Sequence, residues 1–246
     1  MSGFVSARPD EIGGGFGMMR WETHLHTKEG SACARSSAAD MARGCKAAGY
    51  DGMFVTDHFY HGNTAVNRSL PWTEWVRQFC LGYYHALETG EQIGLRVCFG
   101  WEYSWQGNDF LTYGLSPQWL AAHPEVISVT PYEYLKLIRA AGGTIVHAHP
   151  FRQAHYVPLI KLLPDLVDAV EVYNGGNSED AFDERALWYA ESYGLRQASG
   201  SDTHDSSIFL GGILTECDIR SPEDYCAALR NGGIAGLVRK GKDCFF

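Results

Sequence analysis

Short apolar runs of strand type alternate with helical stretches from about residue 18 to the end of the chain. This alternation is typical of β-α units and predicts a largely parallel sheet. The expected strands cover residues 18–23, 52–56, 95–103, 110–114, 143–147, 168–173 and 196–199. The expected helices cover residues 37–48, 71–89, 131–141, 178–193 and 221–231.

The expected helix at residues 71–89 shows the apolar pattern most clearly. Proline is favoured at the first position of a helix, and Pro71 precedes aromatic residues spaced three or four apart. Such a stripe predicts a face buried in the core, made of Trp72, Trp75, Phe79 and Tyr83.

The sequence contains no internal repeat, low-complexity linker or composition shift that would separate two domains. A length of 246 residues suits one α/β barrel. We therefore expect a single barrel domain at residues 18–246. Residues 1–17 are rich in glycine and do not resemble a secretory signal. We expect them to form a flexible lead-in.

The composition narrows the classes of partner. No apolar run approaches the roughly 20 residues of a membrane helix, so we expect a soluble protein without a membrane partner. The formal charge of −9 offers no basic field for a nucleic acid and favours small substrates. Seven scattered cysteines without a C-x-x-C pair suit free thiols in a reducing cytoplasm. The sequence carries no signal for oligomeric state.

Six of the ten histidines lie at the ends of expected strands. Residues two apart in a strand point to the same side, and all strands of a parallel barrel end on one face. Imidazole and carboxylate groups together suit Zn²⁺, Mn²⁺ or Fe²⁺. A single such histidine is more often a packed residue, but four segments together predict a metal centre. The histidines are His24, His26, His58, His147, His149 and His204.

The ordered motifs resemble those of the PHP (polymerase and histidinol phosphatase) superfamily over about residues 18–205. The resemblance implies a distorted TIM-like (β/α)7 barrel with two or three divalent ions that hydrolyses phosphomonoesters or, in polymerase-associated members, phosphodiesters. The motifs are His24-x-His26, Thr56-Asp57-His58, Gly100-x-Glu102, Ala148-His149-Pro150, Glu171-x-x-Asn174 and Gly200-x-Asp202-x-His204.

The resemblance also implies how the ligands divide among the ions. The first ion would be held by His24, His26, Glu102 and Asp202. Glu102 would bridge to a second ion, which His149 also binds, and His58 and His204 would hold a third. The residues expected to act in catalysis are Glu102, Asp202 and His204.

Two positions depart from the common pattern of the superfamily. Many members have Ser-Asp-Gly where this chain has Lys28-Glu29-Gly30, so Glu29 is our candidate ligand beside the third ion. Many members have a histidine where this chain has Asp109, which is either a ligand of the second ion or a loop residue that caps a turn. His147 is expected either to support the ligands or to belong to the core.

A positively charged side chain would complete a phosphate site beside the ions. Arg152, two residues after Pro150, is the first candidate, and Arg35 is the second. For Arg152 the alternative is an exposed loop arginine.

We therefore expect a metal-dependent phosphoesterase that hydrolyses a small-molecule phosphomonoester through a metal-activated hydroxide, since a bound divalent ion lowers the pKa of water from 15.7 toward about 7. Three alternatives stay open: a nuclease-type phosphodiesterase, a zinc amidohydrolase and a non-catalytic metal-binding scaffold. An amidohydrolase would ordinarily carry a lysine between its metals, and only Lys28 lies at an expected strand end. A scaffold has no need for a costly cluster of converging charges.

Overall fold

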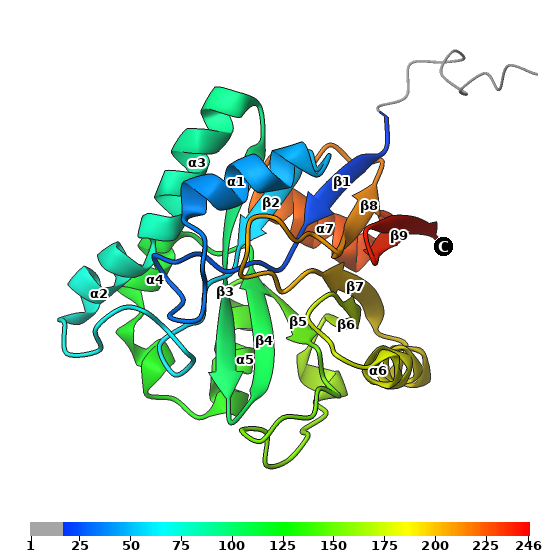
Figure 1. The fold of residues 1–246 in the computed structure, drawn as a ribbon. Coiled ribbons are helices and arrows are strands. Elements are labelled where there is room, and N and C mark those ends of the chain that lie inside the picture. The colour runs from blue at the N-terminus through cyan, green and yellow to red at the C-terminus, as the bar shows by residue number, and fades with distance from the viewer. Residues whose placement is uncertain (1–16) are drawn as a thin grey trace, which may run out of the picture.

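The computed structural model describes residues 17–246, which form one mixed sheet with helices on its outside (Figure 1). Ten strands follow the order β10-β9-β8-β1-β2-β3-β4-β5-β6-β7. The strands are β1 (Met19–Glu22), β2 (Gly52–Val55), β3 (Arg96–Trp105), β4 (Asn108–Tyr113), β5 (Thr144–Ala148), β6 (Ala169–Asn174), β7 (Arg196–Gly200), β8 (Gly211–Thr215), β9 (Ile234–Arg239) and β10 (Lys242–Phe245).

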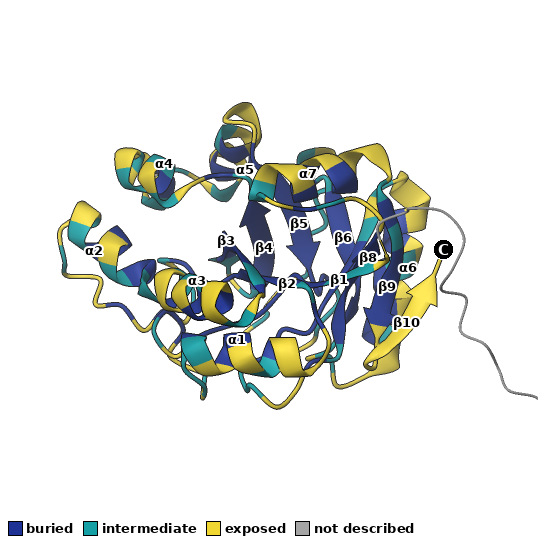
Figure 2. Ribbon diagram, turned by 90° about the horizontal axis from the view of Figure 1, so that it is seen from above, coloured by how far each residue is buried: buried dark blue, intermediate teal, exposed yellow. Residues whose placement is uncertain are grey.

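The helices lie on both sides of these strands, and their outward faces are exposed while most of the strands are buried (Figure 2). Helices α5 and α7 lie on one side in this view, and α1 and α3 lie on the other. The helices are α1 (Ala38–Ala47), α2 (Trp72–Phe79), α3 (Leu81–Ile93), α4 (Pro117–Ala122), α5 (Pro131–Ala140), α6 (Asp180–Tyr193) and α7 (Pro222–Asn231), with short 3-10 turns at Pro124–Ile127 and Pro164–Leu166.

The sheet is barrel-like α/β, but it differs from the largely parallel, distorted TIM-like (β/α)7 barrel expected from the sequence. Only β1-β2-β3 and β5-β6-β7 are parallel, whereas β4, β8, β9 and β10 pair antiparallel with their neighbours. Two tight hairpins cause part of the difference. Gln106 and Gly107 have φ of 54° and 77°, and Lys240 and Gly241 have φ of 50° and 72°. Positive φ at both central residues is the type I′ turn, which returns the chain antiparallel.

Strand β7 is the last strand in the order of the sheet, yet it also lies against β8, which is third from the opposite end. Two serine side chains, one in β7 and one just after it, accept hydrogen bonds from β8. The Gly212 N–H donates to Ser199 Oγ at 3.1 Å, and the Gly211 N–H donates to Ser201 Oγ at 2.8 Å. The sheet therefore curls back on itself, and side-chain hydrogen bonds join the two regions where a backbone ladder is missing.

Every expected strand and helix has a counterpart in the structure, with one interruption. The expected helix at 71–89 is divided at Cys80 into α2 and α3. Of its aromatic stripe, Trp75 and Phe79 are fully buried, while Trp72 and Tyr83 pack at the edge of the core. Four elements were not expected, namely α4, β8, β9 and β10.

The expected lead-in at residues 1–17 lies outside the described residues apart from Gly17. Within residues 17–246, no helix has both the length and the apolar character that crossing a membrane requires.

Candidate metal centre

The predicted ligands converge at one end of the sheet. His24 and His26 follow β1, His58 follows β2, and Asp202 and His204 follow β7, each just beyond the carboxyl end of its strand. Backbone bridges join Leu25 to Thr203 and His58 to Glu102, which bring these segments together. The parallel course of β1, β2 and β3 therefore places residues that are far apart in sequence on one face, as the sequence predicted.

The antiparallel course of β4 adds a carboxylate to this face. Asp109 lies near the start of β4, where it pairs with Ser104 of β3 and Ala148 of β5. Because β4 runs in the opposite direction, its first residues lie at the carboxyl ends of its neighbours. Asp109 Oδ2 consequently lies 3.8 Å from His149 Nε2, inside the cluster.

Glu102 is the centre of the cluster and is 1% exposed. Its Oε1 lies 3.2 Å from His24 Nε2 and 3.3 Å from His149 Nε2, and its Oε2 faces His58 Nδ1. Four overlapping groups of three residues have ligand atoms that all lie within 4.8 Å of one another. The groups are His24, His26 and Glu102; His24, His149 and Asp202; Glu102, Asp109 and His149; and His26, His58 and His204.

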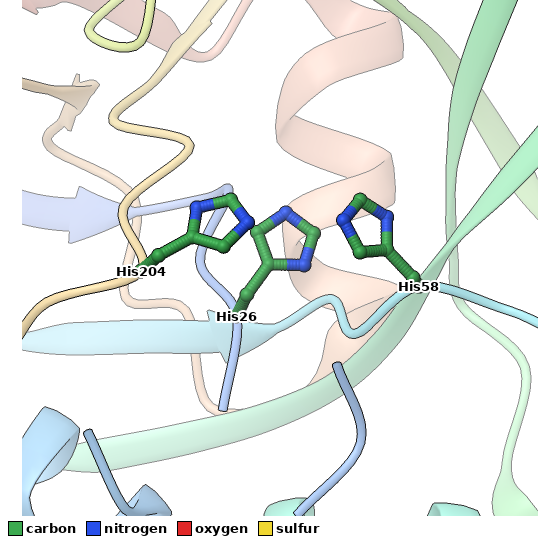
Figure 3. A group of neighbouring side chains, drawn as sticks. All are labelled: His26, His58 and His204. Carbon is green, nitrogen blue, oxygen red and sulfur yellow. The ribbon is translucent and has the colours of Figure 1, made fainter. Parts of the chain in front are cut away.

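The last of these groups contains three imidazoles. Figure 3 shows the ring of His26 between those of His58 and His204. The ring centroid of His26 lies 4.2 Å from that of His58 and 4.3 Å from that of His204. Three neighbouring rings of the same charge type would repel one another if all were protonated, so neutral imidazoles that share a cation suit this geometry.

Neighbouring acceptors set which nitrogen of each histidine is free. His24 Nδ1 lies 2.9 Å from Glu171 Oε1, and a carboxylate oxygen only accepts, so His24 donates from Nδ1. His26 Nδ1 lies 3.1 Å from Ser31 Oγ, whose own proton goes to Asp57 Oδ1 at 2.7 Å. Both imidazoles thereby turn Nε2 toward the cluster as the nitrogen that a metal ion would take, which is how a second layer of residues orients metal-binding histidines.

The charges of the cluster favour a cation at its centre. Burial alone would raise the pKa of Glu102, but the charges of His58 and His24 outweigh it and hold that pKa well below its usual range. Burial also opposes protonation of His24, yet Glu171, Asp202 and Glu102 hold the pKa of His24 well above its ordinary value. The carboxylates thus stay ionised and attract positive charge to this point, whether from a proton or from a metal ion.

One buried polar atom of the cluster, Asp109 Oδ1, makes no hydrogen bond. An unpaired buried polar atom costs roughly 1–3 kcal/mol, so this oxygen calls for a further partner. His58 Nδ1 and Glu102 Oε2, by contrast, lie in contact with each other. Nitrogen and oxygen donors in this mixture fit Zn²⁺, Mn²⁺ or Fe²⁺, and the residues present are therefore suited to hold divalent ions.

Two of the cluster residues have strained backbone. His149 has φ of 29° and Asp202 has φ of 51°, in the left-handed region that non-glycine residues rarely adopt. Each such residue costs roughly 1–3 kcal/mol, and strain of this kind collects at functional sites. At both positions it turns the side chain into the cluster just after the strand has ended.

A pocket of about 540 Å³ opens above the cluster. Its lining includes Glu102, Asp109, His149 and Asp202 at the cluster and Arg152 beside it. The Arg152 guanidinium donates to Asp202 Oδ2 at 2.7 Å, to Asn174 Oδ1 at 2.7 Å and to Asn177 Oδ1 at 3.1 Å. Arg152 is thus partly buried and fixed by three hydrogen bonds at the edge of the pocket. The alternative interpretation, an exposed loop arginine, does not describe this side chain.

Three other predicted or open positions lie apart from the cluster. Glu29 accepts from the backbone N–H of Ala38 at 2.9 Å and lies beside His85, so its carboxylate faces the start of α1. The side chain of Arg35 is exposed and does not line the pocket. Of the two roles expected for His147, the structure supports the core one, because its ring stacks on Phe110 at 4.7 Å and burial lowers its pKa to about 3.

The structure adds two side chains that the sequence reasoning did not assign to the site. Glu171 orients His24, and its place in the Glu171-x-x-Asn174 motif was an available signal. Cys33 lines the pocket, with Sγ 3.1 Å from His204 Nε2. Burial raises the pKa of Cys33, but hydrogen bonding with His204 and His58 outweighs it and brings that pKa to about 6. Nothing in the sequence around Cys33 distinguishes it from the other scattered cysteines.

Comparisons with solved structures show the fold class. A two-domain protein from Bacteroides vulgatus, described as containing a predicted PHP-like metal-dependent phosphoesterase, has a TM-score of 0.69 at 14% identity, over 96% of this chain and 70% of its own. A protein from Bifidobacterium adolescentis, whose name as a metal-dependent phosphoesterase is itself inferred, has a TM-score of 0.52 at 18% identity, over 76% of this chain and 88% of its own. PsfC from Pseudomonas syringae has a TM-score of 0.55 at 16% identity, over 85% and 87%.

No family model matches the chain, and no curated protein matches its sequence. At these identities the likeness is one of fold. The fold of this chain is therefore similar to that of proteins described as PHP-like or other metal-dependent phosphoesterases, and this likeness of fold agrees with the resemblance that the ordered motifs predicted.

Proposed function

We propose that the chain is a metal-dependent phosphoesterase that hydrolyses a small-molecule phosphomonoester at a site for two or three divalent ions. The observation that carries the proposal is the arrangement at the floor of the 540 Å³ pocket. There, the four groups of possible ligands overlap, because Glu102, His24, His26 and His149 each belong to two of them. Arg152, which is hydrogen-bonded to Asp202, lies beside them. Divalent ions with an adjacent guanidinium are the groups that bind and polarise a phosphate ester.

The chain's residues divide the work of such a site. Glu102 belongs to two of the ligand sets, so it would join neighbouring ions. Asp202 Oδ1 lies 3.1 Å from His26 Nε2, and Asp202 Oδ2 lies 2.7 Å from the Arg152 guanidinium. Asp202 would therefore connect the metal ligands with the arginine that binds the phosphate. When bound, the ions supply an acidified water and neutralise the phosphate oxygens. His204, at the rim, is 28% exposed and belongs to the group of three imidazoles that would hold a further ion.

The pocket favours a small ester over a polymer. Its volume lies within the range of about 300–1,000 Å³ typical of small-molecule sites. Outside the cluster its lining includes His61, Ser104, Gln106 and Tyr156. The net charge of −9 gives little attraction for a long polyanion. These features support a phosphomonoester as substrate and make a nuclease activity the second candidate.

We also propose that the protein works in the cytoplasm. All seven cysteines lie within the described residues and are free thiols, four of them buried. Free thiols persist in a reducing compartment, where disulfides are rare.

The test uses purified full-length protein that is stripped with a chelator and reloaded separately with Zn²⁺, Mn²⁺ or Fe²⁺. We expect release of phosphate from a panel of phosphomonoesters, and loss of that activity in His24→Ala and Asp202→Ala with the far-ultraviolet circular dichroism unchanged. His123→Ala is the matched control, because His123 lies outside the cluster, where it pairs with Glu125 and stacks on Trp119. That variant should keep wild-type turnover.

Other outcomes would select the other classes. Cleavage of single-stranded DNA without monoester turnover would establish the nuclease, and turnover of amides alone would establish the amidohydrolase. Protein that binds the ions but turns over no ester, nucleic acid or amide would be the metal-binding scaffold. Failure to bind any of the ions, together with no phosphate release, would refute the proposal.

A further inference from the structure

The thiol of Cys33 lies at the edge of the three-imidazole group formed by His26, His58 and His204. Its Sγ lies 3.1 Å from His204 Nε2, and it is also within hydrogen-bonding reach of His58. Both Cys33 and the two outer histidines line the same pocket. The thiol therefore adjoins two candidate ligands at once, which separates it from the other six cysteines of the chain.

The protonation of His204 follows from its other contact. His204 Nδ1 lies 3.0 Å from the carbonyl oxygen of Asp202, which can only accept, so the ring donates from Nδ1. Its Nε2 is the nitrogen that faces Cys33 Sγ. One proton lies between these two atoms, and it occupies the place that a metal ion would take between a thiolate and an imidazole.

His58 supplies the second observation. Its Nδ1 faces Oε2 of Glu102, and its ring centroid lies 4.2 Å from that of His26 and 5.8 Å from that of His204. Ligand atoms of His26, His58 and His204 all lie within 4.8 Å of one another, and the Cys33 thiol adjoins this group. A thiol and several imidazoles beside a buried carboxylate form a donor set that suits a cation.

The carboxylate expected at this position is engaged elsewhere. Glu29 accepts from the Ala38 N–H at 2.9 Å and lies 3.3 Å from His85 Nδ1, so it faces the start of α1. The chain therefore has Cys33, rather than Glu29, beside His58 and His204. We propose that Cys33 is a thiolate ligand of the third metal position, together with His58 and His204, and that this position prefers Zn²⁺ to Mn²⁺.

This assignment deepens the proposed function and rests on the metal centre described above. With a Zn–S distance of about 2.3 Å and a Zn–N distance of about 2.0 Å, a tetrahedral zinc separates its sulfur and nitrogen ligands by roughly 3.5 Å. The observed 3.1 Å between Sγ and Nε2 needs only a small opening. On binding, the Cys33 S–H bond breaks, its proton passes to solvent, and Sγ bonds to the ion. Thiolate favours Zn²⁺ over Mn²⁺, which prefers oxygen.

The experiment follows Co²⁺ binding to chelator-treated full-length protein by absorption spectroscopy. A cobalt-bound thiolate gives a near-ultraviolet charge-transfer band that imidazole and carboxylate ligands do not give. We expect the band in the wild type and in Cys244→Ser, whose exposed thiol is the matched control. We expect Cys33→Ser to lose the band and one equivalent of bound zinc. Cys33→Asp should keep that equivalent without the band and should bind Mn²⁺ in preference.

The proposal is overturned if the wild type binds its full complement of Co²⁺ without the band, or if Cys33→Ser retains the band. Phosphomonoester turnover is measured on the same samples so that the two proposals can fail separately. Turnover without the band would keep the phosphoesterase and remove the thiolate ligand. The band without turnover would keep the thiolate ligand and remove the phosphoesterase.

Discussion

The Arg152 guanidinium donates a hydrogen bond of 2.7 Å to Oδ2 of Asp202. The other carboxylate oxygen of Asp202, Oδ1, faces Nε2 of His26 at 3.1 Å. Asp202 therefore lies between the positive charge of Arg152 and a candidate metal ligand. Burial alone would raise the pKa of Asp202, but His24 and Arg152 outweigh it and hold that pKa well below its usual range. In the proposed function, this aspartate would therefore couple metal binding to phosphate binding.

Replacing Arg152 should weaken both functions. We expect Arg152→Ala to lower kcat/KM for a phosphomonoester by roughly 10- to 100-fold, because a charge-assisted hydrogen bond contributes about 1.5–3 kcal/mol. Arg152→Lys should recover little, since one ammonium group cannot reach Asp202, Asn174 and Asn177 together. Steady-state kinetics compared with Arg185→Ala, an exposed arginine of α6, measures the effect. Wild-type kinetics in Arg152→Ala would exclude it from the phosphate site.

Glu102→Gln should release metal from more than one position. The amide loses one of the two charged oxygens that contact His24, His149 and His58. We expect a fall in affinity of roughly 100-fold or more for the ions it joins, and the bound ions can be counted by mass spectrometry after dialysis. Glu216→Gln, on the surface, provides the matched control. An unchanged metal content in Glu102→Gln would contradict its central place.

Glu29 should matter for stability and not for metal binding. It accepts from the Ala38 N–H at the first turn of α1, where an acceptor and a negative charge are both favourable. We expect Glu29→Ala to lower the free energy of unfolding by about 1 kcal/mol, and Glu29→Gln, which keeps the acceptor, to lower it less. Urea denaturation measures both. If Glu29→Ala also lost a bound ion, Glu29 would return to the ligand set in place of Cys33.

Glu22 should make the metal-free protein less stable as the pH rises. Burial raises the pKa of Glu22 from 4.5 to about 7, although hydrogen bonds from Ser201 and His24 oppose the rise. Between these values the folded state holds a proton that the unfolded state has released, so the free energy of unfolding falls with increasing pH, by about 3 kcal/mol in all. The loss begins near pH 4.5 and is complete above pH 7.

The measurement is the free energy of unfolding from pH 4 to pH 8 in the presence of a chelator. Glu22→Gln cannot ionise, and we expect its stability to fall less across this window than that of the wild type. Glu91→Gln, which changes an exposed carboxyl of α3, should follow the wild type. Parallel curves for Glu22→Gln and the wild type would show that the pKa of Glu22 is the same in the folded and unfolded states.

The sequence predicted the elements whose signals are local. Apolar runs of strand length and the amphipathic stretches between them gave β1 to β7 and most of the helices close to their observed bounds. It did not predict β8, β9 and β10, because short glycine-containing segments become strands only when a partner supplies their hydrogen bonds. The hairpin turns at Gln106-Gly107 and Lys240-Gly241 also lack the usual asparagine or aspartate signal.

The same division holds for the candidate site. The sequence by itself determined that histidines and carboxylates would meet at the strand ends, since that follows from spacing and from parallel strand direction. Only the tertiary structure decided their orientation. His147 and His149 are two apart, yet the left-handed φ of His149 separates them, with one in the core and the other in the cluster.

Glu29 and Cys33 make the same point for the third metal position. The sequence favoured the carboxylate, because residue type and spacing were the only guides, and the structure places the thiol beside His204. Side-chain direction beyond a strand end depends on backbone dihedral angles and on contacts with distant segments. A ligand set is therefore defined by convergence in space, which the order of residues along the chain does not specify.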